Sequence, residues 1–410
     1  MKPSIIKNPL KLLTAMILLN AMPSHAIYNL YKSGDFSFDV HGEINTYGQK
    51  NSQKYTYLYP ETGWASVNND YEAITKGAYE QRSDRRVRLG QDTGASWTEF
   101  RASRKLRDGW RVSGAIGFGY YDSGTGMYLN SANMAFDKKD LGSLSLGRQY
   151  LHTGYVTRTN TYTPLETFGE NSIRLDYTAI KGLHASGYYS LPASSDVRKK
   201  KNGQEVEGFG ASVSYLHPLD DHQTVRVALG YSDSRQNAKT TGRDSNFYAT
   251  KSQGTAASVE YRNNKLLLAA DIGQKNEQIN GTVTDKSKGN YMGVKVGYEI
   301  TPRLTMTAGF GKKVAERTQK SGAALIHAYS KDLCVADAND SCHNFVQAYE
   351  TALFDKIDSK RSYVRADYYL RENVRLYGRI DDEKITNQLG NKDFSKLHNT
   401  GYRAGVSFIF

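Results

Sequence analysis

Apolar and polar side chains alternate along many short stretches of this chain. The final stretch places Tyr402, Val406 and Phe408 at one set of alternate positions, and Arg403 and Ser407 at the other set. Successive side chains of a β-strand point to opposite faces, so this pattern predicts a strand with one apolar face. Exposed to water, such a strand would be an unpaired edge that promotes aggregation.

About sixteen such stretches of roughly 8–12 residues follow one another between residue 36 and the last residue. Tight turns such as Arg107-Asp108-Gly109 alternate with long polar connections. An even number of strands with short turns at one end and long loops at the other predicts an all-β fold, a transmembrane antiparallel up-and-down β-barrel. The last strand is expected to pair with the first, at 36–47, which closes the barrel and removes the edge. The sequence RRVRLGQ, at 85–91 in the long first connection 48–95, allows either an extra ribbon or a misaligned strand.

The first 26 residues predict export across a membrane. Three lysines precede a short apolar run at 12–22, and Ser24-His25-Ala26 supplies a small-x-small cleavage site. A membrane anchor is the alternative, but the run is well below the ~20 residues that span a bilayer. We therefore expect residues 1–26 to be a cleaved signal peptide and 27–410 to form a single barrel domain.

Composition agrees with a chain of strands and turns. The chain contains 30 Tyr and 37 Gly but only 8 Pro, and no long apolar run follows the signal segment, so helical membrane spans are not expected. The net charge is +12, and cleavage of the three signal lysines lowers it to +9. This positive charge favours a weak cation preference or a mild anion preference in any pore that the chain forms.

Two cysteines, Cys334 and Cys342, lie in the polar segment DLCVADANDSC. An exported chain meets an oxidising compartment, so we expect a disulfide between them, with two free thiols as the alternative. Only His343 is adjacent to them, and no metal site is expected. Asp337, Asn339 and Asp340 fall far short of a complete calcium loop.

Several stretches, in order, resemble the general diffusion porins of the Gram-negative outer membrane. They are FSFDVHGEINTYG near the start, RKLRDGWRVSGAIGFGYY, DKKDLGSLSLGRQY, PLETFGEN, and the terminal GVSFIF. The resemblance covers nearly the whole exported chain. It implies a barrel of sixteen strands in the bacterial outer membrane, assembled as a homotrimer, with a third external loop folded into the lumen.

The resemblance also implies which residues line the narrowest part of the pore. The inward loop corresponds to 151–170. Its carboxylates face a cluster of wall arginines in the family. Carried over by position, the set comprises Glu166 and Glu170 on the loop, and Arg148, Arg174 and Arg101 on the wall.

Three features depart from the family pattern. The loop reads PLETFGE where the family has Pro-Glu-Phe-Gly-Gly, which puts the conformation of its tip in doubt. A first-strand position that often carries lysine is Glu43 here, and we include it among the pore residues. Arg148 shares its parity with the apolar Leu144 and Leu146, so only a twist or bulge would turn it inward.

The function implied is filtering rather than catalysis. Opposed carboxylates and guanidinium groups across a narrow pore create a transverse field that sets which ions and small hydrophilic solutes pass. No Gly-x-Ser-x-Gly or His-Glu-x-x-His motif occurs, so no enzyme and no cofactor are expected. A substrate-specific sugar or acidic-oligosaccharide channel remains the alternative, and the long loops could also act as receptors.

We expect the basic cluster Lys199–Lys201 either to be solvated or to contact lipopolysaccharide phosphates. It has no interleaved aromatic residues, so no nucleic-acid site is expected.

Overall fold

The computed structural model describes twelve ranges of the chain: 28–59, 63–67, 70–74, 77–84, 88–91, 96–120, 127–191, 204–238, 249–280, 284–319, 355–389 and 392–410. The predicted signal segment, both cysteines and Lys199–Lys201 lie outside these ranges. In the described residues, no helix is both long and apolar enough to cross a membrane.

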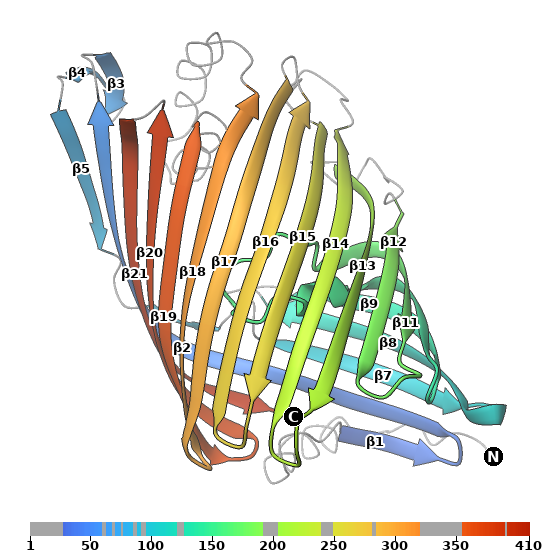
Figure 1. Ribbon diagram of the computed structural model, residues 1–410. Helices are drawn as coiled ribbons and strands as arrows, with labels where there is room; N and C mark the ends of the chain where they lie inside the picture. Colours follow the sequence, from blue (N-terminus) through green and yellow to red (C-terminus); the bar gives the residue numbers. More distant parts are fainter. Residues whose placement is uncertain are drawn as a thin grey trace.

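A closed, antiparallel, up-and-down barrel of sixteen strands dominates the described part of the chain (Figure 1). The predicted fold class and strand number are confirmed. The barrel strands are β2 (Phe36–Tyr59), β7 (Trp97–Lys105), β8 (Trp110–Tyr120), β9 (Met127–Lys138), β10 (Gly142–Tyr150), β11 (Phe168–Tyr177), β12 (Leu183–Ser190), β13 (Gln204–Pro218), β14 (Thr224–Ala238), β15 (Ala249–Arg262), β16 (Leu266–Asn280), β17 (Thr284–Thr301), β18 (Leu304–Gln319), β19 (Lys356–Arg371), β20 (Val374–Leu389) and β21 (Lys392–Ile409).

The first and last barrel strands close the cylinder, as the alternation predicts. β2 pairs with β21 from Glu43↔Ile409 to Tyr57↔Ser395. Beyond the end of β21, Phe410 and Gly42 exchange two backbone hydrogen bonds, with N···O distances of 2.6 and 2.9 Å. Closure gives the backbone groups of both strands partners, which a bilayer interior cannot supply.

Short additional strands from both before and after β2 pair with it, and β2 is unusually long. β1 (Tyr28–Ser33) forms a hairpin with the start of β2. β6 (Arg88–Gln91) and β5 (Gly77–Asp84) pair with the upper half of β2, beyond the part that pairs with β7. β3 (Gly63–Val67) and β4 (Asp70–Ile74) form a separate two-stranded ribbon. Residues 88–91 of the RRVRLGQ segment therefore belong to an added ribbon on β2.

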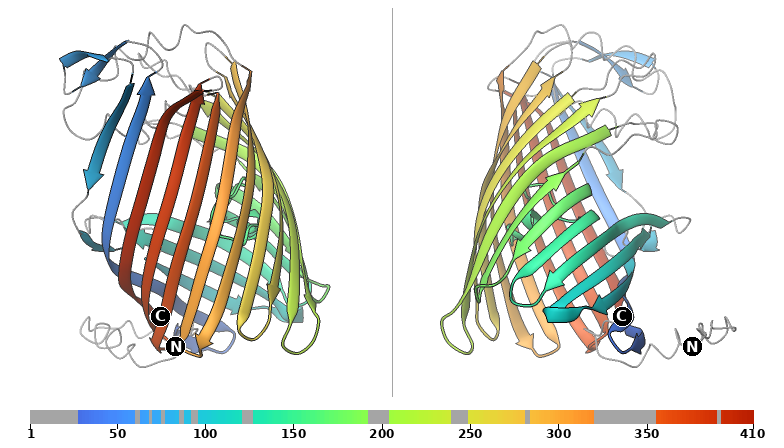
Figure 2. Two further views of the ribbon diagram at one scale, coloured as in Figure 1. Left: turned by 60° about the vertical axis from the view of Figure 1, so that its left-hand side comes forward. Right: turned by 90° about the vertical axis from the view of Figure 1, so that its right-hand side faces the viewer.

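Tight turns join the strands at the end of the barrel that holds the C-terminus (Figure 2). The turn between β7 and β8 needs two left-handed residues, Asp108 (φ 58°) and Gly109 (φ 76°). Asp and Gly tolerate this conformation better than most residues do. The Asp-Gly pair in the sequence thus fixes the first predicted hairpin.

Burial in the barrel is the reverse of that in a soluble protein. Large apolar side chains such as Leu175, Leu229 and Ile272 are 57–65% exposed on the outer face. Serines on the opposite parity, such as Ser172 and Ser232, are buried. The strands therefore present an apolar surface outward and a polar one inward, as expected for a barrel in lipid.

Strand length differs around the barrel. β7–β12 contain 8–12 residues each, whereas β13–β21 contain 14–18. The two views in Figure 2 show that the wall is low on the side of the short strands.

Candidate functional site

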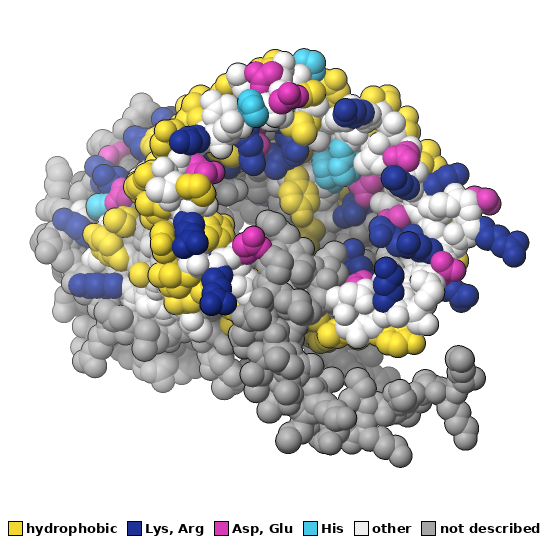
Figure 3. Space-filling model, turned by 90° about the horizontal axis from the view of Figure 1, so that it is seen from below, with side chains coloured by type: hydrophobic (Ala, Val, Ile, Leu, Met, Phe, Trp, Pro, Cys, Tyr) yellow, Lys and Arg dark blue, Asp and Glu magenta, His cyan; other side chains and the backbone are white. Residues whose placement is uncertain are grey.

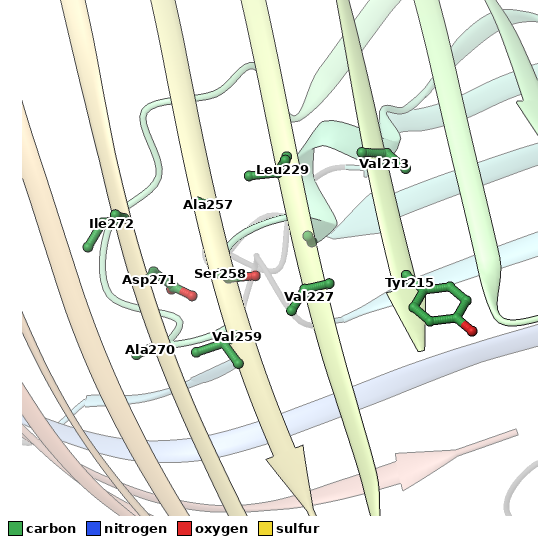
Figure 4. Close-up of a pocket in the computed structure, with 11 residues that line it drawn as sticks. Val213, Tyr215, Val227, Leu229, Ala257, Ser258, Val259, Ala270, Asp271 and Ile272 are labelled. Atoms are coloured by element: carbon green, nitrogen blue, oxygen red, sulfur yellow. The ribbon is translucent and has the colours of Figure 1, made fainter. Parts of the chain in front are cut away.

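The segment between β10 and β11, residues 151–167, lies against inward-facing residues of the barrel wall. It begins with a short 3-10 turn, η3 (His152–Tyr155). Figure 4 views β13–β16 from outside, with the apolar Leu229, Val227 and Ile272 on the near face and the chain of this segment behind the strands. We call residues 151–167 the inner loop.

One wall carboxylate, Asp271 of β16, holds the bend of the inner loop. Its oxygens accept hydrogen bonds from Arg158 N (2.8 and 2.9 Å), Thr159 N (2.7 Å) and Thr159 Oγ1 (2.6 Å). Asp271 is only 5% exposed. Hydrogen bonds to a charged acceptor are stronger than those between neutral groups, so this carboxylate is a firm attachment point. Tyr363 of β19 adds a bond from its hydroxyl to Thr159 O (2.9 Å), and the Lys295 ammonium donates to Arg158 O.

A small apolar cluster holds the two flanks of the bend. Val156 and Leu165 of the inner loop pack on Ala228 of β14 and Ala256 of β15, and all four are buried. Gly230 leaves the room for this contact, because a Cβ there would lie 2.7 Å from Leu165 Cδ1 and 2.8 Å from Val156 Cγ2. The loop thus approaches the wall closely where the wall has no side chain.

Glu166, the carboxylate expected on the inner loop, lies against the wall strand β14. Its Oε1 accepts a hydrogen bond from Ser234 Oγ (2.9 Å), and its backbone N donates to Ser232 Oγ (3.1 Å). The exposed side chains of the inner loop are neutral: Tyr155, Asn160 and Thr163. In the inner loop, the groups most accessible to solvent are therefore hydroxyls and an amide.

Arg148 and Glu170 form a pair with each other. Arg148 Nη1 lies 3.0 Å from Glu170 Oε1, and its guanidinium lies 4.8 Å from the centre of the Phe168 ring. A bulge interrupts the β10–β11 ladder between Gly147 and Gln149. Gln149 is buried, and Arg148 stays opposite Ala132 on the parity of the exposed Leu146.

The other expected wall residues have separate partners. Arg174 Nε donates to Asp176 Oδ2 (2.9 Å), and Arg101 Nη2 donates to Glu99 Oε1 (2.8 Å). Both arginines lie on the inward parity of their strands, opposite to Ile173 and Phe100. The structure places these two residues on different parts of the wall, and neither bonds to Glu166.

Glu43 belongs to another group of charges. Its Oε1 accepts hydrogen bonds from Arg375 Nη2 (2.6 Å) and Ser407 Oγ (2.5 Å), which links β2 to β20 and β21.

A row of three arginines that the sequence analysis missed crosses β19, β20 and β21. Arg365 lies directly opposite Arg379, and Arg379 lies directly opposite Arg403. Their strand neighbours Val364, Ile380 and Tyr402 are exposed on the outer face, so the row is on the lumen side. We call these residues the arginine row. Each member lies over a tyrosine ring, at 5.5 Å for Arg365–Tyr377, 4.7 Å for Arg379–Tyr363 and 4.8 Å for Arg403–Tyr47.

Three like charges on neighbouring strands repel one another unless the wall compensates them. Asp367 binds Arg365 through Nε (2.7 Å) and Nη2 (2.7 Å). Asp381 binds Arg379 through Nε (2.8 Å) and Nη2 (2.6 Å). Arg403 Nη2 donates to the neutral Gln49 (3.0 Å). Carboxylates therefore neutralise Arg365 and Arg379.

The start of the inner loop contains a titratable contact. The His152 ring lies 3.8 Å from the His184 ring, and its Nδ1 is 2.9 Å from Ser212 Oγ. Burial, together with the charges of His184, Arg174 and Arg158, lowers the pKa of His152 from 6.5 to about 4, although Asp176 opposes the shift. A neutral His152 is therefore part of the docked arrangement near pH 7.

Two further inner-loop groups have shifted pKa values. Burial, with the neighbouring Arg226, lowers the pKa of Arg158. Burial and the Glu383 carboxylate, 3.5 Å from the hydroxyl, raise the pKa of Tyr162. Near pH 7 Tyr162 is thus a neutral hydrogen-bond donor. Among the described residues, no group of three or more His, Cys, Asp or Glu side chains is placed to hold a metal ion.

Comparison with known proteins adds to this geometry. No family of known sequences matches the chain, and no curated protein matches it. Solved structures do match. A loop-deletion mutant of OmpT, an outer membrane protein of Vibrio cholerae, aligns with a TM-score of 0.57 at 12% identity, covering 92% of this chain and 100% of that one. The outer membrane channel DcaP of Acinetobacter baumannii aligns with a TM-score of 0.55 at 11% identity, covering 93% and 100%.

A third match is OmpF of Salmonella typhi, in complex with daunomycin, with a TM-score of 0.50 at 14% identity and coverage of 93% and 100%. At such low identity these likenesses show the fold alone. The sixteen-stranded barrel that the porin resemblance implied is therefore the fold of this chain.

Proposed function

We propose that this protein is a pore in the bacterial outer membrane for passive diffusion of ions and small hydrophilic solutes. The observation that carries the proposal is the inner loop, which is bonded to the lumen face of the wall at Asp271. A barrel with a polar, charged interior and a loop across it leaves a narrowed aqueous path. DcaP of Acinetobacter baumannii, which shares the fold, is an outer membrane channel.

We propose that charged wall groups filter the solutes. The sequence predicts acidic loop residues opposed by Arg148, Arg174 and Arg101. We propose instead that a neutral loop surface lies opposite basic wall residues. The support is that Glu166 bonds to Ser234 of the wall, whereas the arginine row lies on the lumen side of β19, β20 and β21. Arg101, Arg174 and Glu43 then act as wall charges within ion-pair networks.

A substrate-specific channel for sugars or acidic oligosaccharides is the second candidate. Tyrosine rings paired with arginines on the lumen side favour it, because sugars stack on aromatic rings and acidic groups bind guanidinium groups. A general pore would pass neutral sugars in order of size alone. A specific channel would take up one solute far faster than others of its size.

We also propose a homotrimer that contacts its copies through the short strands. The outer face of β9–β11 exposes Met134, Leu144, Ile173 and Leu175, and one structure of OmpT of Vibrio cholerae is described as a trimer form. From the sequence alone, we also propose that residues 1–26 direct export, that Cys334 and Cys342 form a disulfide, and that Lys199–Lys201 bind lipopolysaccharide.

Liposome swelling tests the proposed function. Vesicles that contain the purified protein are diluted into iso-osmotic solutions of neutral sugars of increasing size. We expect swelling rates that fall smoothly as the sugar becomes larger. Swelling no faster than that of protein-free vesicles would contradict a pore, and fast swelling with a single sugar would favour the specific channel.

A further inference from the structure

A recess of about 420 Å³ opens in the lumen between the inner loop and the tight-turn end of the barrel. Its lining includes six basic side chains and only two acidic ones, Glu299 and Asp367. The residues on which the argument depends are Asn160 of the inner loop, Arg262, Lys295, Arg365, Arg375 and Arg379. Seen from this end, the molecule is hollowed, and Lys and Arg side chains lie along the rim and within the hollow (Figure 3).

We infer that this recess binds the oxyanion of a small solute, a carboxylate or a phosphate. The inference rests on the proposed pore and names the class of solute that the pore holds longest. Narrow, low-dielectric walls strengthen the field of charges inside them, so an excess of basic groups concentrates anions there.

The arginines of the recess are held ready for an anion. Arg365 and Arg379 each bind the aspartate two residues further along the strand through Nε and Nη2. Within the described part of the chain, neither Nη1 group has a protein acceptor. Each guanidinium is also fixed over a tyrosine ring, Tyr377 or Tyr363. A guanidinium group that is held on one edge and has available N–H groups on the other binds a carboxylate with little further loss of side-chain entropy.

Arg375 completes the same flank. Its Nη2 donates to Glu43 (2.6 Å), and its Nε lies 3.4 Å from Asp367. Asp367 is thus shared between Arg365 and Arg375. Asp381 and Glu43 also pair with this flank, but neither lines the recess, so the lining on this side presents three guanidinium groups and one carboxylate. A solute oxyanion in the recess would meet mostly positive charge.

The opposite flank is also basic. Lys295 of β17 holds the backbone of the inner loop at Arg158 O, and Arg262 of β15 lies 3.4 Å from Glu260. Asn160, in the left-handed region at φ 59°, forms the bend that places the loop at this recess. Its exposed amide can donate to a solute hydroxyl or oxyanion.

The test uses citrate and inorganic phosphate as anionic probes and glucose as the neutral one. Channels in a planar bilayer are titrated with each probe, and binding to the detergent-solubilised protein is measured by calorimetry. We expect citrate or phosphate to block the current and glucose to leave it unchanged. The relative strength of the two blocks tells a carboxylate site from a phosphate site.

The critical variant is the double substitution R365Q/R379Q. Loss of two charge-assisted contacts should raise the half-blocking concentration of the stronger anion by about tenfold or more. R365K/R379K keeps the two positive charges but lacks the planar guanidinium groups, so it should raise the half-blocking concentration by less. The matched control is R111Q/K275Q, because Arg111 and Lys275 are ion-paired cations on the inward parity that do not line the recess. Circular dichroism establishes that each variant retains its β-structure.

Two results overturn the inference: neither anion binds in calorimetry or blocks the current, or R365Q/R379Q raises the half-blocking concentration no more than the control does. Absence of any current from the wild-type protein would instead refute the proposed pore. Calorimetry would then still test whether the recess binds anions. Anion binding that is lost in R365Q/R379Q and kept in the control supports the recess as the binding site.

Discussion

The inner loop is held at two regions of the wall by different interactions. At Asp271, four hydrogen bonds from the bend at 158–159 converge on one buried carboxylate. Around Gly230, apolar side chains pack on a wall that lacks a side chain. The first contact is directional and depends on a single residue, whereas the second is distributed over several. Asp271 thus sets where the bend lies, and the Gly230 region sets how closely the loop approaches the wall.

The largest effect is expected from D271A. It removes the acceptor of several charge-assisted bonds and leaves two buried backbone N–H groups unpaired, which weakens loop docking by about 3 kcal/mol or more. We expect single-channel recordings of D271A to show a larger mean conductance and much greater current noise than the wild type.

D137A is the control for this prediction. Asp137 is also an ion-paired wall carboxylate, but its partner is Arg111 and it has no bond to the inner loop. Noise in D271A no greater than in D137A would show that the bend does not depend on Asp271.

A smaller effect is expected from G230A. The new methyl group would meet Leu165 Cδ1 at 2.7 Å, and overpacking of this kind costs about 1–3 kcal/mol. The loop should move away from the wall and narrow the path, so we expect conductance to fall. G114A is the matched control, because a Cβ at Gly114 has no atom within 4 Å.

The double variant G230A/L165A sharpens this prediction. L165A removes the Leu165 contact and leaves the one with Val156, so it should restore part of the lost conductance, and the two substitutions should be non-additive. Strict additivity of their effects would place the cause outside the Gly230–Leu165 contact.

The smallest effect concerns pH. The docked loop lowers the pKa of His152 from 6.5 to about 4, so docking favours the neutral ring. Its contribution is complete above about pH 6.5 and is lost as the pH falls through about 4. Protonation places a charge near His184, Arg174 and Arg158, and the attraction of Asp176 offsets only part of their effect.

We therefore expect current noise to rise on acidification from pH 7 to pH 4 in the wild-type protein. H152N, which lacks the titrating ring, should have a flatter profile. An identical rise in H152N would assign the effect to other groups.

Much of the barrel could be predicted from the sequence because strand periodicity is a local property. The alternation around residues 172–176 correctly predicts that Ile173 faces outward and that Arg174 faces inward. The Asp-Gly turn at 108–109 and the closing pair of β2 and β21 also follow from local pattern and from the need to remove edges. These features depend on neighbouring residues or on a rule that applies to every barrel.

The arginine row could not be predicted in the same way, because it depends on register between strands. The β19–β20 ladder shifts by one residue between Tyr369 and Arg371, and this shift brings Arg365 opposite Arg379. Without the bulge, Arg365 would face Ile380, which lies on the outer side. Nothing in the local sequence marks the bulge. The loop contacts of Glu166 and Asp271 are likewise long-range and have no local signal.

The central claim is that the barrel encloses an open aqueous path narrowed by the inner loop. Single-channel recording of the folded wild-type protein in a planar bilayer tests it most directly. The account predicts stepwise insertions of uniform conductance, with current proportional to voltage at low voltage. Folded, β-rich protein that inserts into the bilayer and carries no current above the bare membrane would contradict it.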